Sequence, residues 1–146
     1  MDTASTISSS TLDATPRNRS ALRVAAIGAL AATVANVALW AGGRAADVGF
    51  LASPPVGDLT IQVGVVLVVL TTLLTFAVGW AVLALATRRS RRWVRVVMAA
   101  AAVVAVVSAG GPLSTAHDTA TGALLAAMHL VTGAAFVVTA ARLRAR

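Results

Sequence analysis

Few side chains of this sequence could do chemistry in an apolar environment, and His129 is the first of them. The chain has 146 residues, of which 58% are hydrophobic. His129 lies about nine residues inside an apolar run, so in a helix it would be roughly 13 Å from the start of that run. By the same counting, Asn36 and Thr71 lie at similar depths in two other apolar runs. A hydrogen-bonded cluster of Asn36, Thr71 and His129 is therefore possible.

Two interpretations of His129 are open. In the simpler one, the neutral ring bonds a Thr hydroxyl or a backbone carbonyl and pins one helix, as polar side chains in membrane bundles do for about 0.6 kcal/mol. In the other, His129 lines a small cavity that binds a ligand or relays a proton. Bis-His haem ligation would need a second buried His, and His117 is expected in an outer loop. Only two copies sharing His129 could supply it.

The remaining acidic, His and hydroxyl residues predict neither a metal centre nor a catalytic group. Asp47, Asp58, His117 and Asp118 match no ligand spacing, and two of them, Asp58 and Asp118, are expected to cap the helices that follow them. The chain has no Cys, which excludes iron–sulfur ligation and thiol catalysis. No nucleophile and base are paired, although Ser114, His117 and Asp118 would be the place to look. We therefore expect no metal, no cofactor and no enzymatic activity.

Four apolar segments must position these residues, and they run over about 24–41, 61–86, 93–110 and 120–141. Each is long enough, or nearly so, to cross a hydrocarbon core of roughly 30 Å as a helix. Because no water is available in the bilayer, each segment must satisfy its own backbone hydrogen bonds, and none alternates as a barrel strand would. The predicted fold class is all-α, an integral membrane four-helix bundle. The Gly110-Gly111-Pro112 sequence is expected to end its third helix.

The domain organisation predicted is a tail followed by the membrane domain. Residues 1–20 contain nine Ser or Thr and no apolar cluster, which predicts a disordered cytoplasmic tail. Residues 21–146 form the four-helix transmembrane domain. A signal peptide is the alternative for the first apolar run, but its length of about eighteen residues exceeds the usual ~7–15.

Arginine placement predicts the orientation of the bundle. Five of the twelve Arg cluster where the second segment is followed by the third, four of them between the segments and Arg95 just inside the third. In the expected outer loops there is only Arg44. Because positive charge is retained in the cytoplasm, both termini are predicted to be cytoplasmic. The five are Arg88, Arg89, Arg91, Arg92 and Arg95. They would also attract anionic lipid headgroups, at about 1 kcal/mol each, although setting the topology is their simpler role.

A net charge of +7 does not predict nucleic-acid binding here, because the charges lie beside apolar ends with no basic aromatic surface between them. The absence of Lys and Glu beside abundant Arg and Ala is typical of a high-G+C bacterial genome. We therefore expect a multi-pass protein of a bacterial plasma membrane, in contact with the bilayer and with no nucleic-acid partner.

Three stretches carry a family resemblance. They are Gly111-Pro112-Leu113, residues 124–130 (LLAAMHL) and the Arg-rich middle loop. In this pattern the chain resembles a family of small four-span membrane proteins of high-G+C bacteria, known only as a domain of unknown function. The resemblance covers about Arg23 to Arg142 and implies four helices. Pro112 and His129 belong to the shared pattern, and the family implies no activity, ligand or catalytic residue.

The function that the sequence favours is a structural or interaction component of the membrane, associating with itself or with another membrane protein. Small residues four apart, such as Gly28 and Ala32, permit close helix packing. No predicted span contains an Asp or Glu, which argues against proton-coupled antiport. The alternative is a binding or permeation module for a small lipophilic molecule, with a polar site around His129.

Overall fold

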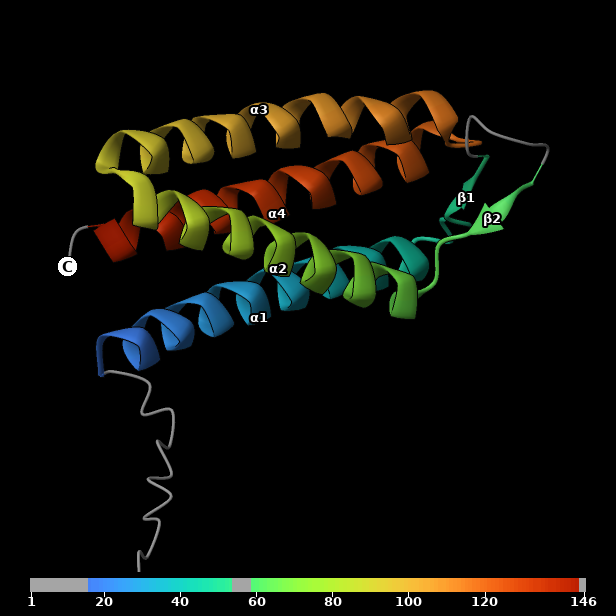
Figure 1. Cartoon of the computed structure of the whole chain (residues 1–146). Coiled ribbons are helices and arrows are strands. Elements are labelled where there is room, and N and C mark those ends of the chain that lie inside the picture. Colours follow the sequence, from blue (N-terminus) through green and yellow to red (C-terminus); the bar gives the residue numbers. More distant parts are fainter. Residues whose placement is uncertain (1–15, 54–58, 145–146) are drawn as a thin grey trace, which may run out of the picture.

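The computed structural model describes residues 16–53 and 59–144, which form an antiparallel bundle of long helices (Figure 1). The helices are α1 (Pro16–Ala45), α2 (Val65–Arg89), α3 (Arg91–Thr115) and α4 (Thr119–Arg144). Each of the four is long and apolar enough to span a membrane. Because a lone helix in lipid satisfies its own backbone, what the tertiary structure adds is packing between the four. The predicted all-α architecture of four packed helices is confirmed.

Two helix starts differ from the ranges expected from the sequence. Helix α1 begins at Pro16, whose missing N–H is not needed in a first turn, so residues 16–20 of the expected tail are helical. The rest of that tail lies outside the described residues. Helix α2 begins at Val65 instead of residue 61, because Ile61–Gln62 form a strand and Gly64 is the N-cap. Asp58, which is outside the described residues, is therefore not the N-cap of α2.

Helix α3 does not end at Gly110-Gly111-Pro112 as predicted but continues through Pro112 to Thr115. The following turn adds hydrogen bonds from side-chain hydroxyls to the backbone, and transmembrane helices tolerate proline beside such residues. Ser114 Oγ and Thr115 Oγ1 donate to the carbonyl of Gly111, at 2.9 and 3.0 Å. Pro112 has no N–H, so the carbonyl of Ser108 loses its ordinary helical donor. The proline marks a defect inside the helix and not its end.

Helix α4 is the centre of the packing, since it makes the most extensive contacts with α3 and then with α1. Gly133 of α4 allows the close approach to α3, because a Cβ there would collide with the Cβ of Ala105. Phe76 of α2 and Phe136 of α4 meet edge to face, with ring centroids 5.7 Å apart. Helices α2 and α4 contact each other least among these pairs. This weak contact leaves room along α2.

The segment between α1 and α2 folds over one end of the bundle. Strand β1 (Leu51–Ala52) pairs antiparallel with β2 (Ile61–Gln62), and Ala52 also bridges to Ala116 beyond α3. Phe50 is fully buried beneath this hairpin, with a positive φ of 53°, and its ring lies 6.3 Å from that of Trp40. A bulky residue holds this backbone conformation only where packing compensates for the strain. Phe50 therefore anchors the hairpin to the helices.

Candidate functional site

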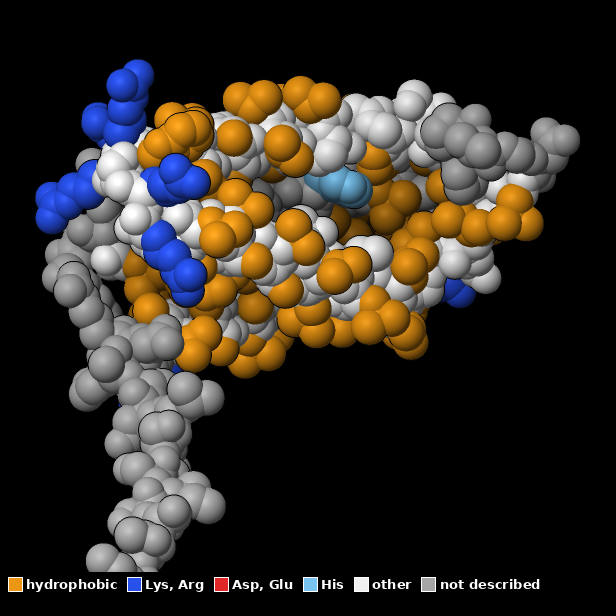
Figure 2. Space-filling view, in the orientation of Figure 1, with side chains coloured by type: hydrophobic (Ala, Val, Ile, Leu, Met, Phe, Trp, Pro, Cys, Tyr) orange, Lys and Arg blue, Asp and Glu red, His pale blue; other side chains and the backbone are white. Residues whose placement is uncertain are grey.

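A groove of about 510 Å³ lies among α2, α3 and α4, with Asn36 of α1 also on its wall. Helices α2 and α3 join at Ser90 and diverge toward the hairpin end (Figure 1). Figure 2 shows the resulting hollow on the face of the bundle, among hydrophobic side chains. The face that carries it belongs to spanning helices, so the groove would open sideways to the acyl chains.

Asn36 is the most deeply buried polar group of this site, with 2% of its surface exposed. Its Nδ2 donates two hydrogen bonds of 2.9 Å, to Thr72 Oγ1 on α2 and to Thr132 Oγ1 on α4. Asn36 thereby ties three helices together. Its Oδ1 is buried and has no hydrogen-bond partner among the described residues.

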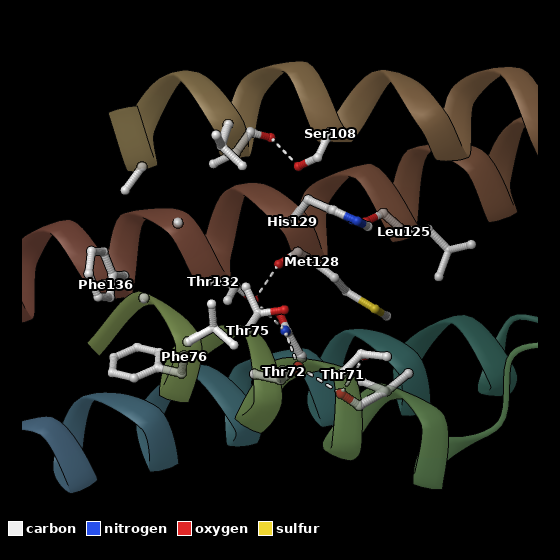
Figure 3. Close-up of a pocket in the computed structure, with 18 of the residues that line it drawn as sticks. Thr71, Thr72, Thr75, Phe76, Ser108, Leu125, Met128, His129, Thr132 and Phe136 are labelled. Atoms are coloured by element: carbon white, nitrogen blue, oxygen red, sulfur yellow. Dashed lines mark hydrogen bonds between the residues drawn. The ribbon is translucent and has the colours of Figure 1, made fainter. Parts of the chain in front are cut away.

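His129 lines the same groove from α4, and its side chain is exposed when no lipid or ligand covers it. Its Nδ1 lies 2.8 Å from the carbonyl oxygen of Leu125, one turn earlier on the same helix (Figure 3). A carbonyl oxygen can only accept, so Nδ1 carries the proton. The ring is held by its own helix, as the simpler interpretation of His129 anticipates, and it also lines a cavity, as the other requires.

The three polar residues singled out from the sequence line one groove but do not bond one another. Thr71 Oγ1 donates to the carbonyl of Leu67 at 2.7 Å, within its own helix. The partner of Asn36 is the next residue, Thr72, because each residue turns a helix by about 100° while changing depth by only 1.5 Å. Counting along the sequence placed the three residues at a similar level of the bundle, but it did not give the direction in which each side chain faces.

Sequence reasoning missed Thr72 and Thr132. Each hydroxyl donates to the carbonyl four residues earlier, at 2.7 Å to Val68 and 2.8 Å to Met128. A Thr that bonds its own helix is compatible with an apolar span, so it gives little signal in the sequence. The signal that could have found them is Asn36, whose amide needs two acceptors from neighbouring helices.

The Arg cluster named above lies where α2 meets α3, at the end of the bundle opposite the hairpin (Figure 2). Arg88 and Arg89 are in the last turn of α2, and α3 starts with Arg91. All five of its side chains are exposed. Arg44 lies near the other end, in the last turn of α1. The charges are thus segregated along the bundle axis.

The hairpin end carries a second polar group. Ser53 Oγ lies 2.8 Å from His117 Nε2, while the backbone N–H of His117 donates to the carbonyl of Leu51. Ser53, not Ser114, is therefore the hydroxyl beside His117. Asp118 does not complete a triad, because its carboxylate accepts from the N–H and hydroxyl of Thr121 as the expected helix cap. These two bonds, the backbone one foremost, lower the pKa of Asp118.

No group of three or more potential metal ligands occurs within residues 16–53 and 59–144. Asp58, one of the four residues considered from the sequence, is outside those ranges. The polar chemistry of the described part of the chain is therefore that of hydrogen bonding, concentrated at the groove and at the hairpin.

By the length and composition of its helices, the chain is a multi-pass membrane protein with a lateral, mainly apolar groove. It belongs to the DUF6069 family, a family of unknown function whose model matches residues 16–146. The resemblance to an uncharacterised family is thus confirmed at the level of the family. No curated protein and no solved structure matches the chain.

Proposed function

We propose that this protein binds a small lipophilic molecule in the groove among α2, α3 and α4, without catalysing a reaction on it. The observation that carries the proposal is the groove itself. Its volume of about 510 Å³ falls within the roughly 300–1,000 Å³ typical of ligand pockets. Its wall is largely apolar and includes a few polar side chains, among them Asn36 and His129, which is the usual composition of such sites.

Binding fits the packing better than permeation does. Phe76 and Phe136 pack edge to face within one core cluster, toward the Arg-rich end. Phe50, Val68 and Met128 form a second cluster beneath the hairpin. Side chains buried in this way interrupt a path along the bundle axis, whereas the side of the groove is open to lipid. A lipophilic molecule would enter laterally from the bilayer.

The proposed location is a bacterial plasma membrane, with both termini in the cytoplasm. The segregation of charge supports this orientation, since Arg-rich helix ends are retained on the cytoplasmic side. The cluster from Arg88 to Arg95 would then meet anionic lipid headgroups, at about 1 kcal/mol per residue. Its exposure leaves the guanidinium groups accessible for such contacts.

The test fills the groove without changing the rest of the bundle. Thr75 is an exposed residue of α2 that lines the groove, and Leu74 beside it is 66% exposed and does not line it. We expect organic extracts of the purified wild-type protein and of Leu74→Trp to contain a lipophilic species enriched over bulk lipid. The same species is expected to be lost from Thr75→Trp, because the indole would occupy its place.

Mass spectrometry of the three extracts is the measurement. Identical extracts from all three proteins would overturn the proposal. That result, combined with recovery of a defined oligomer or complex in mild detergent, would favour the structural or interaction role that the sequence alone put first.

A further inference from the structure

We infer that the ligand of the groove is a neutral lipophile that carries a hydroxyl donor, an alcohol or a phenol, and not a ketone, a quinone or an ether. This inference rests on the proposed function, because it specifies the chemistry of the molecule in the same groove.

Asn36 offers an acceptor. Both Nδ2 protons are used by Thr72 and Thr132, and the buried Oδ1 has no donor among the described residues. Exchanging the amide N and O would not relieve this, because both Thr hydroxyls already donate to backbone carbonyls and would turn only lone pairs toward an oxygen. A buried acceptor without a donor costs about 1–3 kcal/mol. Oδ1 itself has almost no accessible surface, so a ligand hydroxyl would reach it only if the Asn36 side chain shifted toward the groove.

His129 offers a second acceptor on the same face. Its Nδ1–H is committed to the carbonyl of Leu125, so the neutral ring has only the Nε2 lone pair left. No described residue donates to Nε2. His129 and Thr132 are three residues apart on α4, which places them on adjacent turns of one helix face. Asn36 and His129 line the same groove, and Nε2 of the exposed His129 ring is the acceptor that a ligand there would meet directly.

The other polar groups of the groove reinforce this bias. The hydroxyls of Thr71 and Ser108 donate to carbonyls of their own helices, as those of Thr72 and Thr132 do. The carbonyl of Ser108 is short of a donor because residue 112 is a proline. Thr75 is the exception among the hydroxyls that line the groove, and it can donate or accept. Apart from Thr75, the described side chains that line the groove have no donor to spare.

Charge complementarity makes the ligand neutral. Among the residues that line the groove, His129 is the only ionisable one, and the Arg cluster lies beyond its edge at the end of the bundle. A carboxylate, phosphate or ammonium group would find no counter-charge at this depth, where an unpaired ion is very costly. A hydroxyl on an apolar body matches both the acceptors and the wall.

The test uses full-length protein in nanodiscs and two probes that differ in one proton, 4-octylphenol and its methyl ether. Saturable binding of radiolabelled 4-octylphenol is measured over that of empty nanodiscs, and each unlabelled probe is used as competitor. We expect the phenol to bind roughly three- to tenfold more tightly than the ether, the ratio that one net hydrogen bond provides. In His129→Phe, which keeps a ring but removes Nε2, the ratio is expected to fall below about twofold.

Leu130→Phe is the matched control, since it places the same ring at a lipid-facing position next to His129 outside the groove, and it should keep the wild-type ratio. Equal affinity for both probes, with binding still abolished by Thr75→Trp, would overturn the hydroxyl inference and leave the proposed function standing. Tighter binding of the ether would do the same. Absence of saturable binding for both probes would overturn both proposals.

Discussion

Asn36 and the two Thr hydroxyls that it contacts form a polar centre in an otherwise apolar interior. Each hydroxyl is satisfied twice, as a donor to its own helix and as an acceptor from Asn36. The network therefore joins α1, α2 and α4 without leaving an unsatisfied proton. Polar bonds of this kind in membrane bundles contribute modestly, at about 0.6 kcal/mol each. Their value here is to fix which helix faces meet.

A double-mutant cycle tests this geometry. We expect Asn36→Ala and Thr72→Val to couple by about 0.6 kcal/mol, because the first removes the donor and the second the acceptor of one bond. Unfolding by sodium dodecyl sulfate in mixed micelles gives the free energies. The control cycle with Thr71→Val should show coupling near zero, since Thr71 bonds only its own helix. Equal coupling in both cycles would contradict the assignment of Thr72.

Asp118 gives a prediction for pH dependence. Its carboxylate accepts from the backbone N–H and the hydroxyl of Thr121, and these bonds lower its pKa in the folded protein. A lowered pKa means that the stabilisation is complete above the ordinary Asp pKa of about 3.9 and is lost as the pH falls through the lower folded value. The wild-type protein should therefore exceed Asp118→Ala in Tm at pH 7, and the difference should shrink in strong acid. A difference independent of pH would exclude the charged cap.

At the scale of elements, small residues decide how closely the helices approach. Helix α3 packs chiefly on α4, and Ala105 lies against Gly133 with no space for another methyl group. On the opposite side of α3 from this contact line, valines such as Val103 and Val107 are more than 60% exposed, as suits a surface in lipid. The hairpin adds a different constraint, because Phe50 closes one end of the same packing.

A pair of Gly→Ala substitutions separates packing from helix propensity. Gly133→Ala is expected to lower the Tm, because its Cβ would collide with that of Ala105. Gly110→Ala, where an added Cβ would meet no packed neighbour within 4 Å, is expected to leave the Tm unchanged or to raise it, since the helix propensity of Ala adds up to about 1 kcal/mol of stability. Thermal unfolding in detergent is the measurement. The packing account fails if both variants respond alike.

At the scale of the whole molecule, the end of the antiparallel bundle that carries the Arg cluster is also the end at which α2 and α3 meet. The α2–α3 junction carries the Arg cluster and holds the two helices together there, while they diverge toward the hairpin (Figure 1). In the proposed orientation, the ends at which α2 and α3 diverge lie away from the cytoplasmic headgroups. A ligand would lie with its hydroxyl in the bundle and its apolar body toward the lipid.

The orientation itself is tested with reporters fused after Arg146. Green fluorescent protein at this position is expected to fluoresce and alkaline phosphatase to be inactive, because the C-terminus is proposed to be cytoplasmic. As a control, phosphatase inserted after Thr60, in the hairpin segment, should be active. An active phosphatase after Arg146 would reverse the orientation.

Composition and segment length were sufficient to predict four helices, because a chain in lipid must satisfy its backbone within each span. They failed at details that depend on neighbours. Pro112 reads as a helix end, yet α3 passes through it to Thr115, at the cost of the ordinary helical donor to the carbonyl of Ser108. Ile61–Gln62 reads as part of a span, yet it pairs with β1 because the hairpin must cover Phe50.

The sequence by itself determined the position of each polar residue along its helix, because that position follows from the rise of 1.5 Å per residue. It could not determine azimuth, since one residue turns the helix by about 100° and the facing direction depends on how the helices pack. Only the tertiary structure decided that Thr72 and not Thr71 accepts from Asn36, and that α2 and α3 diverge to leave a groove. Each helix satisfies its own backbone hydrogen bonds, so contacts between helices depend on side chains. Among the described residues, one side-chain acceptor, Asn36 Oδ1, is left without a donor.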